Sequence, residues 1–341
     1  MTDITRQQRL AFLLGLALLS ATAGLLLLGA SVGSTGLESL SRIRIDPLAL
    51  QIVWDIRLPR TVGAWLAGAL LGLAGAVAQG LFRNPLADPY LLGSASGASL
   101  GVALAMVLLG ALPATSAFAP WLVQLGLTGA AFIGAVAAVL LTLALARGVQ
   151  HTLRLLLAGV VVGVVLGALG SLTMLLRPEV MQTLQAFILG STGFVDWAAC
   201  ALMAGVLLLC LIVAWAFSHV LDGLSLGEAT AASLGLPVAS MRAALVVVLA
   251  LATGTAVAQT GLIGFVGLAA PHLVRSVAKT THGRLILLSS LMGGVLLTAA
   301  DTLARWLLAP QELPVGVLTA VLGGGYLLWL MHRQGSGGRL P

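Results

Sequence analysis

The side chains that could do acid–base, metal or nucleophilic chemistry are few in this sequence and lie far apart. The 341 residues include 17 Lys and Arg, 11 Asp and Glu, and 2 Cys. The sequence contains no HExxH zinc motif and no CxxCH motif for covalent cofactor attachment. Ser94-Ala95-Ser96-Gly97 lacks the leading glycine of a GxSG protease motif, and small serines beside glycines are typical of packing. These patterns predict a protein that is not an enzyme.

Nucleotide hydrolysis is also not expected from this chain. A P-loop requires GxxxxGK[ST], in which the lysine reaches the phosphates. The only lysine, Lys279, has no such motif around it. Cys200 and Cys210 would lie about 15 Å apart on one helix, too far for a disulfide. We therefore expect no cofactor or metal to be bound by this chain, and ATP with its Mg²⁺ would belong to a separate subunit.

Three arginines stand at the ends of apolar runs, namely Arg57, Arg60 and Arg305. A guanidinium group can pair bidentately with a carboxylate of another protein. It can equally anchor a helix by extending its charged end to the membrane interface. The residue types alone leave both interpretations open. Asp55 and Asp301 lie close to these arginines in the sequence and are placed to hold them in position.

The composition indicates a membrane protein. Apolar residues make up 59% of the chain, charged residues only 8%, and the mean hydropathy is +1.09. A soluble domain carries roughly 25% charged residues, so lipid must cover much of this surface. The arginines form no basic stripe with interleaved aromatic residues, and nucleic acid is therefore not an expected partner.

A membrane-spanning helix needs about 20 apolar residues. The sequence predicts an all-α integral membrane protein, a single transmembrane permease domain over 1–341. Its ten expected spans are 10–32, 58–81, 91–110, 121–146, 153–175, 197–217, 238–258, 261–274, 285–308 and 314–331. The eighth is short and contains Pro271, which is typical of a broken span packed inside protein. The first continues to Val32, which favours an uncleaved helix over a signal peptide.

Charge asymmetry orients the predicted bundle. Cytoplasmic segments of membrane proteins carry an excess of Lys and Arg. With ten spans, most of the 17 basic residues lie on one side if both termini are cytoplasmic. The segment 222–238 then lies inside the cell, and its helix-forming part is closed by Gly235 and Pro237. It is either an ordinary solvated loop or the docking surface of an ATPase.

Small residues recur four positions apart, as in Gly159, Gly163 and Gly167, with shorter rows at 68–72 and 97–101. Such rows let helices approach closely in lipid. They serve packing alone, or the 159–170 row also faces a translocation pathway. A faint internal repeat, AVAQG at 76–80 and AVAQTG at 256–261, fits the inverted repeats of many transporters.

Longer motifs carry a family resemblance over nearly the whole chain, in one order. They are RLPR at 57–60, NPLADPYLLG at 84–93, LGEATAASLGLP at 226–237, GLIGFVGLAAPHLVR at 261–275 and ELPVGVLTAVLGG at 312–324. The sequence resembles the FecCD-type permease subunits of ABC importers for vitamin B12, haem and ferric siderophores. The resemblance implies the type II importer permease fold, with inverted halves in spans two to five and seven to ten.

The resemblance also implies the partners and the site residues. It implies a homodimer in the lipid of a bacterial inner membrane, two copies of a cytoplasmic ATP-binding subunit, and a periplasmic substrate-binding protein. Residues that match the family's ATPase-coupling segment are Glu228, Ala232, Leu234 and Gly235. Those that match its binding-protein contacts are Arg57, Arg60 and Arg305. Those that match its cytoplasmic gate are Asn84, Leu86, Thr152 and Leu153, and Gly159, Gly163 and Gly167 lie on the matching pore-lining helix.

The substrate that the resemblance implies is a large metal chelate carried inward by alternating access. The chain looks closest to the haem permeases, and ferric siderophores and cobalamin are the alternatives. An ion-coupled secondary carrier is the alternative from another class. Such carriers place ionisable residues near mid-membrane, whereas the carboxylates here fall in predicted loops or near span ends.

Overall fold

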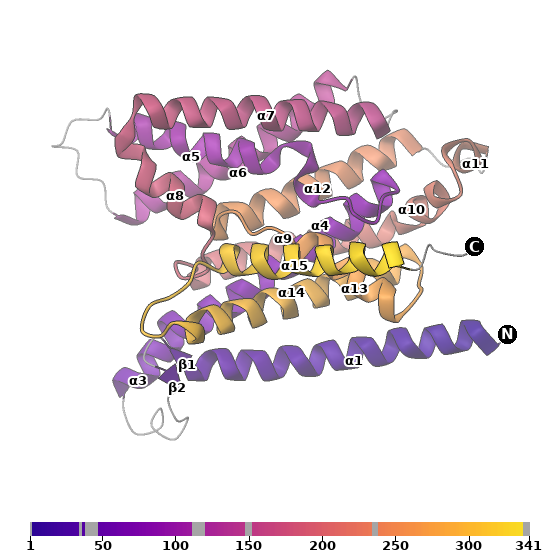
Figure 1. The fold of residues 1–341 in the computed structure, drawn as a ribbon, viewed down its shortest axis with the longest axis horizontal. Coiled ribbons are helices and arrows are strands. Elements are labelled where there is room, and N and C mark those ends of the chain that lie inside the picture. Colours follow the sequence, from indigo (N-terminus) through magenta and orange to yellow (C-terminus); the bar gives the residue numbers. More distant parts are fainter. Residues whose placement is uncertain are drawn as a thin grey trace.

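The computed structural model describes residues 2–33, 36–37, 47–110, 120–146, 152–233 and 238–336. The long helices of this part are roughly aligned in one bundle (Figure 1). They are α1 (Thr2–Ser31), α4 (Leu58–Phe82), α5 (Ser94–Gly110), α6 (Pro120–Leu145), α7 (Thr152–Leu176), α9 (Trp197–Ala216), α12 (Val238–Thr260), α13 (Val266–Val277), α14 (His282–Leu307) and α15 (Val315–Ser336).

Shorter elements connect these helices. They are the two-residue strands β1 (Val32–Gly33) and β2 (Gly36–Leu37), which pair antiparallel, α3 (Pro47–Ile52), the π-helical turn η1 (Val53–Arg57), the 3₁₀ turns η2 (Pro89–Leu92) and η3 (Pro178–Val180), α8 (Met181–Leu189), α10 (Ser218–Ser225) and α11 (Glu228–Ser233). A helix overlaps each of the ten predicted spans. The sequence did not predict α8 or α10 as separate helices.

Within the described residues, seven helical segments are long and apolar enough to cross a membrane, and α5 and α15 contain shorter apolar helices. The eighth predicted span overlaps α13, which is 12 residues long with Pro271 inside it. A helix this short spans less than 20 Å at about 1.5 Å per residue. It packs against α4 and α14, and the residues around Pro271 are buried there, whereas Val277 at its end is 46% exposed.

The centre of the bundle is α4, which packs against α14, α12, α13 and α9. A Cβ atom on Gly68 would lie 2.3 Å from the carbonyl oxygen of Gly293, and one on Gly72 would lie 2.1 Å from that of Ser289. Only glycine lets the backbones of α4 and α14 come this close, and van der Waals packing of this kind holds helices together in lipid.

The bundle has a covered interior and an open edge. In an apolar stretch of 18 residues in the segment that contains α4, 89% of the residues are buried. The corresponding share in α1 is 11%. Figure 1 shows α1 along one side of the bundle, beside α14, with α5, α6 and α7 on the opposite side. Gly97 of α5 and Gly134 of α6 pack as tightly as the α4–α14 pair.

Candidate transport sites

A buried carboxylate, Asp301, joins two of the predicted arginines near the end of α14. Its side chain is fully buried. Oδ1 accepts hydrogen bonds from Nε and Nη2 of Arg60 at 3.2 and 3.1 Å. Oδ2 lies 2.9 Å from Nη2 of Arg305. The predicted contact of Asp301 is confirmed for Arg60 and Arg305, although Arg60 lies 241 positions away in the sequence. The same prediction for Asp55 and for Arg57 stays a prediction.

Two further residues complete this cluster, and neither was predicted from the sequence as a site residue, although Glu312 opens the motif at 312–324. The Thr192 hydroxyl donates to Oδ1 of Asp301. Glu312 accepts a 2.6 Å hydrogen bond from Nη1 of Arg60. Because the Glu312 side chain is 36% exposed, it is the part of the cluster that water reaches. The cluster therefore ties α4 and α14 to the loops before α9 and before α15.

The three predicted docking arginines are all largely covered. Exposed fractions are 7% for Arg57, 9% for Arg60 and 2% for Arg305. Nη1 of Arg305 donates to the carbonyl oxygens of Gly29 and Val32 at 3.0 and 3.1 Å. In this conformation Arg305 holds the end of α1 in place, and its guanidinium does not face solvent. A docking role for Arg57, Arg60 and Arg305 stays a prediction.

The predicted gate turn follows α4. The helix ends at Arg83, whose φ of 48° is left-handed and whose N–H bonds back to Gln79 and Gly80. Asn84 Oδ1 then accepts from the Leu86 N–H at 2.9 Å, a turn typical of asparagine. The Leu86 side chain is 49% exposed at this tip.

The same connection is anchored on its other side by η2. Asp88 Oδ1 accepts from the Tyr90 N–H at 2.8 Å, and the Tyr90 hydroxyl donates to the Ile263 carbonyl at 3.1 Å. Burial raises the pKa of the Asp88 carboxyl, while the hydrogen bond from Tyr90 lowers it. The gate turn is thus fixed at one end to the segment before α13.

The second predicted gate segment opens α7. Thr152 is the first residue of this helix. Leu153 follows, and its side chain is 70% exposed. Leu86 and Leu153 are therefore both exposed apolar side chains at helix ends. Their role as gate residues stays a prediction.

The predicted coupling segment contains two short helices. In α10, Val220, Leu221 and Leu224 are buried. Asp222 accepts from the backbone N–H of His282 at 3.0 Å and lies 2.7 Å from its Nδ1, which joins α10 to the start of α14. Glu228 and Ala232 lie in α11, whereas Leu234 and Gly235 fall outside the described residues.

The glycine row of α7 faces its own chain. A Cβ on Gly159 would lie 2.1 Å from the Leu91 carbonyl oxygen of η2. Cβ atoms on Gly163 and Gly167 would lie 3.8 Å from the Ser96 hydroxyl of α5. These contacts within the chain agree with the interpretation that the glycine row serves helix packing. A role beside a pathway stays a prediction.

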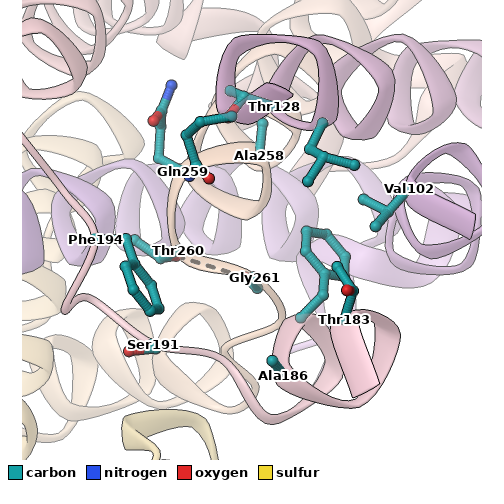
Figure 2. A pocket seen from close by; sticks show the side chains of 13 residues that line it. Val102, Thr128, Thr183, Ala186, Ser191, Phe194, Ala258, Gln259, Thr260 and Gly261 are labelled. Atoms are coloured by element: carbon teal, nitrogen blue, oxygen red, sulfur yellow. Dashed lines mark hydrogen bonds between the residues drawn. The ribbon is translucent and has the colours of Figure 1, made fainter. Parts of the chain in front are cut away.

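The two AVAQ repeats place the same amide side chain in different surroundings. Gln79 is 2% exposed; its Nε2 donates to the Leu268 carbonyl and its Oε1 accepts from Arg275. Gln259 instead borders a cavity of about 180 Å³ between α5, α6, α8 and α12. Figure 2 shows Gln259 and Thr260 on one side of this cavity and Thr183 of α8 on another. None of the described residues that line it is charged.

These features define a class of protein. Long apolar helices held together by glycine contacts, with the clustered charges close to helix ends, are the features of a multi-pass membrane protein. The model of the FecCD transport family matches residues 12–333. The chain belongs to this family, and it is a permease of the type II ABC importer fold.

Two relatives and two solved structures illustrate the match. The hemin transport system permease protein HmuU of Yersinia pestis is 40% identical over 289 residues, which cover 84% of this chain and 85% of HmuU. The vitamin B12 import system permease protein BtuC of Salmonella paratyphi A is 42% identical over 283 residues, 83% and 84% of the two chains.

A structure described as an inward-facing conformation of a metal-chelate type ABC transporter aligns with a TM-score of 0.80 at 30% identity, covering 93% of this chain and 99% of that one. PsaBC from Streptococcus pneumoniae aligns with a TM-score of 0.55 at 19% identity, covering 85% and 92%, and shows the fold alone.

Proposed function

We propose that this chain is the permease subunit of an ATP-driven importer that carries a large metal chelate, with haem as the leading candidate, into the cytoplasm. The observation that carries the proposal is the family match over residues 12–333. The absence of a P-loop assigns ATP hydrolysis to a separate subunit. The 40% identity to a hemin permease and the 42% identity to a vitamin B12 permease support haem and cobalamin alike, so cobalamin is the second candidate, and a ferric siderophore is the third.

The assembly that fits this function is a homodimer with two ATPase subunits inside and one binding protein outside. An exposed stripe on α7 supports a partner surface there. Val161, Val164 and Val165 are 57, 68 and 51% exposed, on the side away from the glycine row. We place the dimer contact on this stripe, and both termini in the cytoplasm of a bacterial cell.

A transport assay tests the function. The permease is reconstituted in proteoliposomes with its ATPase and binding protein, and haem, cobalamin and a ferric siderophore are offered separately. Uptake of haem that requires ATP and survives a collapsed ion gradient is the expected result. Uptake that follows the ion gradient without ATP would instead identify a secondary carrier. ATP-dependent uptake of cobalamin alone would replace haem with the second candidate.

We propose that the binding protein docks at Arg60, where one of its carboxylates replaces Glu312 as the partner of the guanidinium. Glu312 already occupies Nη1 of Arg60 and is the partly exposed member of the cluster. A carboxylate from the binding protein can replace Glu312 on Arg60, so that no other buried cation has to become exposed. Arg57 and Arg305 then act mainly by holding the surrounding helix ends.

Charge reversal tests this docking proposal. We expect Arg60→Glu to weaken binding-protein affinity by about 2–5 kcal/mol, the range for truncating one partner of a buried interfacial charge pair. Arg177→Glu is the matched control, because Arg177 is exposed and pairs only loosely with Glu179 at 3.5 Å. Affinity is measured in nanodiscs at two salt concentrations, with ATPase assembly as the folding check. Equal effects of the two variants would remove Arg60 from the docking surface.

A further inference from the structure

A polar, basic cavity lies where α1 begins, beside the connection from α13 to α14. This open cavity has a volume of about 630 Å³ and is lined by Gln7, Gln8, Asp222, Lys279, Arg284 and neighbouring threonines. Lys279 and Arg284 contribute two cations, and both residues are exposed. The one carboxylate, Asp222, is directed to His282 and its backbone N–H. The lining therefore carries a net positive charge.

A second, apolar cavity of about 280 Å³ shares Gln8 and Arg284 with the first. Its other lining residues include Phe12 of α1 and Leu287 of α14, which are 67 and 42% exposed. The basic cavity thus lies at the helix ends, and the apolar cavity continues from it to side chains one to two turns further along α1 and α14.

The exposure of α1 indicates that lipid surrounds this site. α1 lies along the edge of the bundle (Figure 1), and its most apolar window is only 11% buried. We therefore expect hydrocarbon chains of the membrane to contact the groove between α1 and α14. A basic pocket at the cytoplasmic ends of membrane helices is a recognised form of anionic-lipid site.

We infer that the two cavities form one binding site for an anionic phospholipid. The phosphate lies between Lys279 and Arg284, and an acyl chain follows Phe12 and Leu287 along the α1–α14 groove. A free phosphate ion would use the basic cavity alone, and a zwitterionic lipid would bring its own cation to Lys279 and Arg284. The apolar continuation and the net positive lining select a lipid with a net negative headgroup.

The site also reaches the proposed coupling segment. Asp222 belongs to α10, and its hydrogen bonds to His282 fix α10 to the first turn of α14, where Arg284 lies. A bound lipid would therefore bridge α1, the α13–α14 connection and α10. Lipid occupancy and the position of α10 are coupled through these contacts.

Native mass spectrometry of the purified, delipidated chain tests the inference. Dioleoyl phosphatidylglycerol, dioleoyl phosphatidylcholine and glycerol phosphate are titrated in turn. We expect phosphatidylglycerol to bind more tightly than the other two. Each cation near a membrane surface corresponds to roughly fivefold in affinity, so Lys279→Gln with Arg284→Gln should weaken binding roughly 30-fold.

Two variants complete the test. Arg83→Gln with Arg154→Gln removes the same charge from the same predicted face, outside both cavities, and should leave phosphatidylglycerol affinity unchanged. Phe12→Ser should weaken phosphatidylglycerol binding and leave glycerol phosphate binding as it was. Equal affinity for the two lipids, equal losses in the two double variants, or glycerol phosphate binding as tightly as phosphatidylglycerol would each overturn the inference.

Discussion

Replacing Asp301 with asparagine would break the buried charge cluster at its centre with almost no change in side-chain volume. The carboxylate is fully buried and lies 3.1 Å from Arg60 and 2.9 Å from Arg305. Asparagine leaves one acceptor and turns an amide N–H₂ toward a guanidinium. Removing one partner of a buried ion pair costs about 3–5 kcal/mol, because the other charge stays buried.

The structure places the expected loss near the lower end of that range. Arg60 keeps its 2.6 Å bond to Glu312, and Arg305 keeps the carbonyl oxygens of Gly29 and Val32. We therefore expect Asp301→Asn to lower the free energy of unfolding by about 3 kcal/mol.

Reversible unfolding in mixed micelles measures this change, and Glu312→Gln is the matched control. The Glu312 side chain is 36% exposed and bonds a single arginine, so its loss should cost at most about 1 kcal/mol. If Asp301→Asn costs no more than Glu312→Gln, the cluster does not hold α4 and α14 together, and the reasoning from burial is refuted.

Three further predictions concern the packing, the gate turn and the coupling segment. Gly159→Ala should lower the free energy of unfolding by about 1–3 kcal/mol, because the added Cβ would meet the Leu91 carbonyl oxygen. The control is Gly170→Ala in the same helix, where the added Cβ meets nothing within 4 Å. This control should be neutral or stabilising in the same unfolding assay. Because burial raises the pKa of Asp88, protonation favours the folded state, and that stability is present at low pH and lost as pH rises through the raised pKa. Asp88→Asn should thus match or exceed wild-type stability at pH 7 and lose that advantage at pH 4; an advantage that grows on acidification would contradict the shift. Leu234→Arg should uncouple transport from ATP hydrolysis by placing a charge in an apolar socket of the ATPase; normal co-purification and transport would exclude this residue from the contact.

The sequence by itself determined the class of the protein and the places of its helices. Apolar runs of span length and the small fraction of charged residues are local properties, and lipid leaves few alternatives to helices for such runs. Glycines four residues apart, as at Gly68 and Gly72, predicted close helix contacts, which the packing of α4 on α14 confirms. The shortness of α13 and its proline could be read directly from the residues around Pro271.

Only the tertiary structure decided which faces of those helices meet. In a membrane protein the packed face and the lipid face are both apolar, so hydrophobic periodicity does not fix the rotation of a helix. The side to which Gly159 turns, and the different surroundings of Gln79 and Gln259, follow from that rotation. Asp301 meets Arg60 across 241 residues for the same reason. A charged residue that is buried requires a partner of opposite charge, but only the packing of the helices determines which residue that partner is.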